Sequence, residues 1–245
     1  MVRQPESLKN SMKGIAQKLL ITGLKGLATL TSNRREQGKL LILIYHRVLD
    51  GPDFMRPTEV DRTQFDWQME LVANYFNPLS LDNGLTLMAE GKLPPRAVCI
   101  TFDDGYADNL TNAVPILKKH NLTATFFIAT GFLNGGRMWN DTVIEALRNS
   151  EGDRLNLTAL GLKNYDISSQ VAKKESAEAI LTAIKHLPPQ ERLNKAEQIG
   201  VEAKSLPNNL MLTTQQLQEL AQSGMEIGGH TVTHPILSTL NKEQA

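Results

Sequence analysis

Residues 97–106 read AVCITFDDGY, a short apolar run that ends in two adjacent acids and a glycine. A run of this kind, bounded by turn residues, predicts a buried strand. Active sites of α/β proteins gather at the carboxyl ends of strands, so we expect Asp103 and Asp104 to face a shared cleft. One such carboxylate can bind a cation while the other takes a proton from a bound water. The alternative is structural, with one Asp capping the next helix and Gly105 making the turn.

The segments on either side of this strand alternate between strand and helix patterns. Helix patterns fall at residues 64–75, 81–90, 107–120 and 213–224. Strand patterns fall at residues 40–45, 97–102, 123–129 and 225–228, and the first is apolar enough to predict a strand buried on both faces. This alternation predicts an α/β fold with parallel strands. Because four strands do not close a barrel, we expect a domain that is incomplete at its C-terminus.

Residues 141–206 break the alternation. They are rich in charged and helix-favouring residues and contain no clear strand pattern, with helix patterns at residues 173–186 and 190–204. We therefore expect a helical insertion over about residues 141–206 of a domain that spans residues 39–245.

The composition excludes some classes of partner. Lys plus Arg and Asp plus Glu number 26 each, so there is no net basic field to hold a polyanion, and nucleic acid is not an expected partner. The only cysteine, Cys99, lies in an apolar run and has no partner for an intramolecular disulfide, so we expect a small buried core residue.

Residues 1–38 predict an N-terminal amphipathic helix and a linker. Lys13, Lys18 and Lys25 interrupt the apolar stretch, which leaves neither a run long enough to span a membrane nor a convincing signal peptide. We expect the helix to dock on the domain, with docking of residues 11–31 on a membrane surface as the alternative. The compartment stays open between the cytoplasm and the periphery of the cell envelope.

A second polar motif follows the last predicted strand. Residues 228–235 read GGHTVTHP, and His230 and His234 would lie on one face if the segment turned helically, so that both rings could reach one metal ion. Taken alone this pair is weak, because the spacing is common and the Glu that follows the first His in zinc-protease helices is absent.

Together the two motifs resemble those of the polysaccharide deacetylase superfamily, the NodB-homology or chitin-deacetylase-like enzymes of carbohydrate esterase family 4. The resemblance rests on TFDDG at residues 101–105 and HTVTH at residues 230–234, with YHRV at 45–48 and ATFFIA at 124–129. It implies a distorted (β/α) barrel with fewer than eight strands, here incomplete at the C-terminus. It also implies an enzyme, a polysaccharide N-deacetylase.

The resemblance further implies a role for each matching residue. Asp103 is the implied general base, and Asp104, His230 and His234 are the implied ligands of a divalent metal. Zinc is the metal we expect first, and cobalt, nickel and iron also suit such a site. The implied reaction is hydrolysis of the acetamide on N-acetylhexosamine units of a polysaccharide.

Three further residues are expected to contact the substrate. His46 ends the first predicted strand, Tyr106 follows the acid pair, and Trp139 lies after the third strand where its ring could stack on a sugar. The alternative for Trp139 is that it anchors the helical insertion. His120 and His186 fall on predicted helices and are expected at the surface.

The chain also departs from the family pattern. The later Arg segment, the apolar residues of the acetate pocket and the late His that acts as general acid have no counterpart among its 245 residues. The alternative function is therefore a catalytically impaired carbohydrate-binding or assembly protein of the same fold. A phosphohydrolase ranks lower, because such enzymes commonly place their acids as Asp-x-Asp. The oligomeric state stays open.

Overall fold

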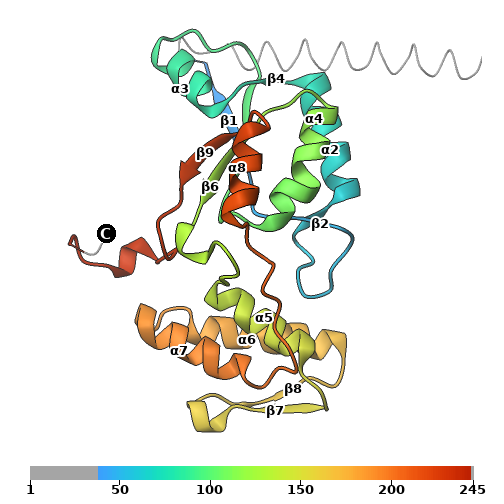
Figure 1. Cartoon of the computed structure of the whole chain (residues 1–245), viewed down its shortest axis with the longest axis vertical. Helices are drawn as coiled ribbons and strands as arrows, with labels where there is room; N and C mark the ends of the chain where they lie inside the picture. The colour runs from blue at the N-terminus through green and yellow to red at the C-terminus, as the bar shows by residue number, and fades with distance from the viewer. Residues whose placement is uncertain (1–37, 244–245) are drawn as a thin grey trace, which may run out of the picture.

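The structure, a computed structural model, describes residues 38–243. Residues 1–37 of the predicted N-terminal unit, including residues 11–31, lie outside this range. Figure 1 shows two bodies stacked along the long axis of the molecule, a sheet body with flanking helices and a smaller helical body.

The sheet body is built on parallel strands, as the sequence predicts. Its order is β1-β5-β6-β9, and the short strand β4 pairs with the start of β5. The bounds are β1 Leu40–Tyr45, β4 Asn77–Pro78, β5 Ala97–Phe102, β6 Thr125–Ile128 and β9 Glu226–Gly229. All pairs are parallel, so the α/β prediction is confirmed. Over residues 38–243 these strands form an open sheet.

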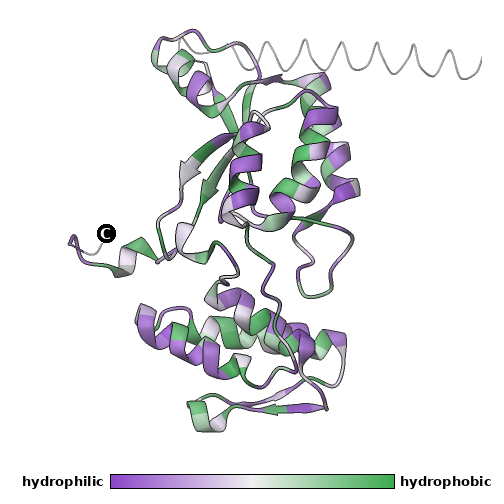
Figure 2. Ribbon diagram, viewed as in Figure 1, coloured by the Kyte–Doolittle hydropathy of each residue, from purple (hydrophilic) through white to green (hydrophobic). Residues whose placement is uncertain are grey.

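Three helices cover one face of this sheet and enclose the larger core. They are α2 (Arg62–Tyr75), α4 (Val114–Lys119) and α8 (Thr214–Gln222). At the centre of the core the ring of Phe102 stacks on Phe126 at 4.7 Å between centroids and on Tyr45 at 5.4 Å. Figure 2 shows hydrophobic residues along β6 and hydrophilic residues on much of the outer surface of α8. Burial of this apolar face is the main force that holds the helices on the sheet.

Capping residues fix where the helices begin. Asp61 and Gln64 form a capping box at the start of α2, and Thr213 and Gln216 form another at the start of α8. The helical segment predicted at residues 107–120 is divided, with a π-helical turn at Asn109–Ala113 ahead of α4. Pro115 has no N–H to donate, which favours a new helix start at this point.

The prediction that the first strand is buried on both faces is wrong. Leu43 and Tyr45 pack on the core, but Ile44 is 62% exposed and Leu41 and Ile42 are also exposed. The reason is that β1 is a terminal strand of the described sheet. On the face opposite the core, the helix at residues 81–89 lies near Leu40, while Ile42 and Ile44 are exposed. By contrast β5, paired on both sides, is buried along its whole length, and Cys99 is fully buried as expected.

The helical body has its own core. It consists of α5 (Trp139–Asn149), α6 (Gln170–Ile184) and α7 (Pro189–Gly200), which pack through a second apolar cluster. Two short strands, β7 (Arg154–Asn156) and β8 (Asn164–Asp166), form an antiparallel hairpin where no strand was expected. Each contributes one buried residue, Leu155 or Tyr165, between polar neighbours, which is too short an alternation to stand out in the sequence.

A further parallel pair, β2 (Val48–Leu49) and β3 (Val60–Asp61), brackets the loop that reaches toward the helical body. Within residues 38–243, no helix is both long and apolar enough to cross a bilayer.

Helix α3 (Leu81–Ala89) lies close against the other face of β5, and this contact gives a first prediction. A Cβ on Gly84 would lie 2.8 Å from Sγ of Cys99 and 3.2 Å from Cδ2 of Leu40. Gly84→Ala should therefore destabilise the protein by about 1–3 kcal/mol, measured by urea unfolding. In a Cys99→Ala background the same change should be neutral or stabilising, because alanine favours a helix by about 1 kcal/mol over glycine.

Gly51→Ala is the matched control, since an added Cβ there meets no atom within 4 Å. An equal effect of Gly84→Ala in the two Cys99 backgrounds would show that the close approach of α3 does not constrain the fold.

Candidate functional site

The acid pair lies on a tight turn that neighbouring strands hold in place. The N–H of Asp103 donates to the Tyr45 carbonyl at 2.9 Å, and the carbonyl of Asp104 accepts from the N–H of Ala129 at 3.1 Å. Asp104 and Gly105 both have left-handed backbone angles, with φ of 78° and 88°. A non-glycine residue in this region carries strain of order 1–3 kcal/mol, which the flanking strands must hold. The turn aims the Asp104 side chain past the end of β5.

The histidine motif reaches the same place by a different backbone from the one expected. Residues 230–234 are not helical. Instead Thr231 and His234 have φ of 63° and 48°, and the N–H of His234 donates to Oγ1 of Thr231 at 3.0 Å. This bend brings the rings of His230 and His234 to 4.8 Å between centroids. The helical turn that was the condition for placing the two rings on one face is therefore not met, although the rings do lie together.

Asp104, His230 and His234 form one cluster of possible metal ligands. Oδ1 of Asp104 lies 3.6 Å from Nε2 of His230 and 3.5 Å from Nε2 of His234, and one ligand atom from each residue lies within 4.8 Å of the others. The Asp104 side chain is only 8% exposed, and its Oδ1 is buried without a hydrogen bond. A buried carboxylate oxygen without a donor is costly, and a cation at this point would relieve that cost. The residues present therefore fit a metal ion.

The electrostatics of Asp104 agree with this geometry. Burial raises the pKa of its carboxyl, and Asp103 raises it further, whereas His234, His46 and His230 lower it. The neighbouring imidazoles therefore favour the ionised form of this carboxyl, whereas its burial disfavours that form. Asp103 itself is half-buried beside this group.

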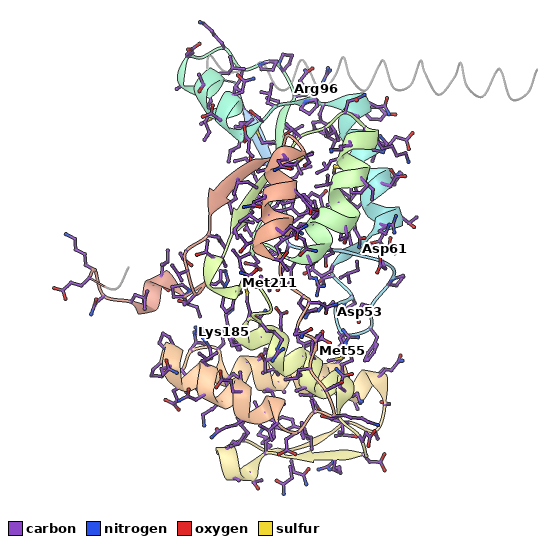
Figure 3. The ribbon with its side chains drawn as sticks, in the orientation of Figure 1. Asp53, Met55, Asp61, Arg96, Lys185 and Met211 are labelled. Carbon is purple, nitrogen blue, oxygen red and sulfur yellow. The ribbon has the colours of Figure 1, made fainter. Side chains whose placement is uncertain are left out.

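A cavity of about 550 Å³ opens between the two bodies at this site. On the sheet side its lining includes His46, Arg56, Glu59, Asp104, Tyr106 and His234. On the helical side it includes Trp139, Asn140, Glu178, Thr182 and Lys185, and Figure 3 shows Lys185 near the level where the two bodies meet. Asp103 and His230 are not among the lining residues.

The three residues expected to contact substrate all line this cavity, in different settings. His46 is exposed. Trp139 is the first residue of α5 and packs on the core of the helical body. The Arg192 guanidinium lies 5.0 Å from its ring centroid. It therefore anchors the helical body and also faces the cavity. Of the other histidines, His186 is exposed, whereas His120 is not on the surface as expected: it is 13% exposed and lies 2.8 Å from Asp66.

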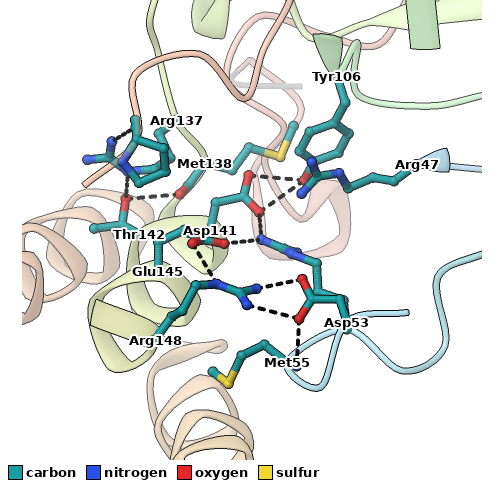
Figure 4. Close-up of polar contacts among 12 residues, drawn as sticks. Arg47, Asp53, Met55, Tyr106, Arg137, Met138, Asp141, Thr142, Glu145 and Arg148 are labelled. Carbon is teal, nitrogen blue, oxygen red and sulfur yellow. Dashed lines mark hydrogen bonds and ion pairs between the residues drawn. The ribbon is translucent and has the colours of Figure 1, made fainter. Parts of the chain in front are cut away.

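Tyr106 is buried, and its hydroxyl is already engaged. It donates to the carboxylate of Asp141 at 3.0 and 3.2 Å, as Figure 4 shows, and the Arg47 guanidinium lies 4.6 Å from its ring centroid. Burial, followed by the charges of Asp141 and Asp104, raises the pKa of this phenol well above its usual value. The hydroxyl therefore stays protonated.

Asp141 belongs to a buried ion network that the sequence analysis missed. Nη2 of Arg56 lies 2.7 Å from Oδ1 of Asp141 and 3.4 Å from Oε1 of Glu145. Arg148 pairs with Glu145 at 2.9 Å and with Asp53 at 2.7 Å, so the loop between β2 and β3 is fixed to α5. Arg56 and Asp141 are 85 positions apart, and no local pattern connects them.

Glu59 is the other residue that the sequence did not single out. Its carboxyl is half-buried and has neither a hydrogen bond nor an ion pair within residues 38–243. Burial is the largest cause of its raised pKa.

A parallel sheet with a cavity and clustered polar residues at the carboxyl ends of its strands is the arrangement of an α/β enzyme. Residues 90–245 match the family model described as polysaccharide deacetylase, which covers more than half of the chain. The chain belongs to the polysaccharide deacetylase family.

Individual relatives agree with this assignment. The chain is 35% identical over 91 residues to the Bacillus subtilis protein YxkH, a match that covers 37% of this chain and 32% of YxkH. It is 26% identical over 210 residues to the poly-beta-1,6-N-acetyl-D-glucosamine N-deacetylase of Staphylococcus aureus, covering 79% of this chain and 72% of the relative. The chain thus matches about a third of the length of YxkH.

Among solved structures, the Streptococcus pyogenes deacetylase PplD in complex with acetate aligns with a TM-score of 0.48 at 21% identity. This alignment covers 84% of the present chain and 62% of the PplD chain.

The ion network gives a second prediction. Asp141→Ala leaves Arg56 buried with one remaining carboxylate partner, Glu145 at 3.4 Å, so we expect a loss of about 3–5 kcal/mol in the free energy of unfolding. Tyr106→Phe removes only the hydrogen bond to Asp141 and should lower the free energy of unfolding by about 1 kcal/mol. Urea unfolding measures both.

The control is Glu151→Ala, which breaks an ion pair with Lys204 in which both side chains are 76% exposed. Its effect should stay within about 0.5 kcal/mol. An Asp141→Ala loss no larger than that of the control would contradict a role for this network in joining the two bodies.

Proposed function

We propose that this chain is a metal-dependent hydrolase that removes N-acetyl groups from N-acetylhexosamine units of a polysaccharide. The observation that carries the proposal is the Oδ1 atom of Asp104, which is buried without a donor and lies 3.5–3.6 Å from two imidazole nitrogens beside a cavity of about 550 Å³. Family membership supports the same reaction.

Asp104, His230 and His234 would hold the ion. One carboxylate and two imidazoles leave coordination positions open for water and substrate, which is the pattern of a catalytic site. Zinc suits these ligands first, and cobalt, nickel and iron also suit them. A bound divalent ion would lower the pKa of a water molecule and polarise the acetyl carbonyl.

The chain's own residues would carry the remaining roles. Asp103, which directly precedes the proposed ligand Asp104 and is half-buried, would accept a proton from the attacking water. Backbone N–H groups of the turn, that of Tyr106 among them, would stabilise charge on the carbonyl oxygen. His46, Tyr106 and Trp139 would contact the sugar from opposite walls of the cavity. The amide bond then breaks to give acetate and a free amine.

The substrate class and the domain organisation are part of this proposal. The Staphylococcus aureus relative is a deacetylase of poly-beta-1,6-N-acetyl-D-glucosamine, which favours a polysaccharide of the cell envelope as the substrate here. We further propose that residues 39–245 act as one deacetylase domain of the distorted barrel type, with the helical body, about residues 141–206, as its insertion.

The test combines metal content with acetate release. Wild type should contain about one metal ion per chain and release acetate from N-acetylglucosamine oligomers. His230→Ala with His234→Ala should lose both properties, because two of three ligands are gone. Asp103→Asn should keep the metal and lower acetate release by roughly 10²–10⁴-fold, the usual contribution of a general base.

His186→Ala, which removes an exposed imidazole outside the cavity lining, is the matched control and should change neither quantity. Metal binding without acetate release would favour a carbohydrate-binding protein of the same fold. Absence of bound metal from the wild type would remove the basis of the proposal.

A further inference from the structure

We propose that Glu59 makes the cavity selective for a partly deacetylated glycan, in which a sugar with a free ammonium group lies next to the N-acetylated sugar. This inference rests on the proposed function, because it assumes that the same cavity holds the glycan. It adds a specificity-determining residue and a preferred substrate form.

The position of Glu59 is the first step. It directly precedes β3, at the end of the loop that the ion network fixes to the helical body, and its backbone N–H donates to the carbonyl of Arg56 at 3.1 Å. It lines the same cavity as Asp104 and Trp139. Because the loop is held on both sides, the carboxyl is placed beside the cavity without depending on a mobile segment.

The second step is that nearby cations are already neutralised. Arg56 pairs with Asp141 and Glu145, and Arg148 pairs with Glu145 and Asp53. This network therefore contains three carboxylates and two guanidinium groups. His46, Arg56 and Arg47 act on the Glu59 carboxyl from a distance and lower its pKa, but none of them forms a hydrogen bond or an ion pair with it in the described residues.

Charges elsewhere on the wall do not change this balance. Glu178 pairs with Lys174 at 3.2 Å, and Lys185 is exposed on the rim, where solvent screens its charge. Arg47 is held by Asp108 at 2.7 Å. Among the described residues that line the cavity, Glu59 is thus a half-buried carboxyl without a hydrogen bond or an ion pair.

The chemistry of the reaction supplies a matching cation. Removal of an acetyl group converts a neutral acetamide into a basic amine, which carries a positive charge at mildly acidic pH. An ammonium group donates charge-assisted hydrogen bonds to a carboxylate, which are about twice as strong as neutral ones. An acetamide at the same position offers only a neutral N–H. The cavity should therefore bind a chain that already carries one free amine more tightly than a fully acetylated chain.

Calorimetric titration of the whole chain carrying Asp103→Asn, which slows turnover, tests this. The ligands are the N-acetylglucosamine tetramer and the same tetramer with one free amine. With Glu59 present, the tetramer with the amine should bind roughly tenfold more tightly at low salt, equivalent to about 1.4 kcal/mol, and the difference should shrink at 0.5 M salt.

Glu59→Gln should abolish the difference, and Glu59→Asp should restore part of it, because the charge returns on a shorter side chain. Glu175→Gln, an exposed change on α6 outside the cavity lining, should leave the difference intact. Thermal unfolding of each variant confirms that it is folded.

Equal affinity for the two tetramers with Glu59 present, persistence of the preference in Glu59→Gln, or failure to bind either tetramer would each overturn the inference. These outcomes are separable from failure of the proposed function. Acetate release by the wild type from fully acetylated oligomers, together with its metal content, decides the proposed function independently of any preference for the amine.

Discussion

The carboxylate of Asp141 joins the two bodies of this molecule. It accepts hydrogen bonds from Tyr106, which follows the acid pair of the sheet body, and from Arg56, which lies on the loop between β2 and β3. Because Asp141 is fully buried, neither interaction competes with water, and loss of either partner would leave a buried charge or hydroxyl unsatisfied. The cavity exists where it does because this contact holds α5 next to the carboxyl ends of the strands. Trp139, two positions earlier on the same helix, is placed in the cavity wall by the same contact.

Three of the six described non-glycine residues with positive φ lie in the cluster of possible metal ligands or in its turn. Asp104, Thr231 and His234 all have positive φ, and Thr231 is β-branched, which makes its left-handed conformation costly. The hydrogen bonds that hold these turns come from β1, β6 and the segment after β6, so the strands maintain a geometry that the local sequence disfavours. Strain of this kind is commonly found where side chains must point to a common centre.

Some of this arrangement was predictable from the sequence and some was not. The strand at residues 97–102 and its terminal acids follow from a local pattern, and the parallel α/β fold follows from the alternation of such patterns. The convergence of His230 and His234 was predicted, but through a helical turn, because spacing alone does not reveal left-handed angles at Thr231. Arg56 was missed because its buried partners lie far away in the chain. Glu59 was missed because the sequence does not show that its carboxyl has no partner in the fold. Burial of residues 40–45 was overestimated, since apolar composition does not say what covers a strand.

The exposed face of β1 bears on how this protein behaves in concentrated solution. Leu41, Ile42 and Ile44 are exposed along a terminal strand of the described sheet, and no lysine or proline interrupts the strand between Leu40 and Tyr45. Strands of this kind are templates to which another strand adds, and natural proteins usually protect them with charge, proline or a covering segment. A segment or partner that covers β1 would therefore reduce the tendency of the protein to associate in solution. A protein of this family that is otherwise balanced in charge has little electrostatic repulsion to keep such edges apart.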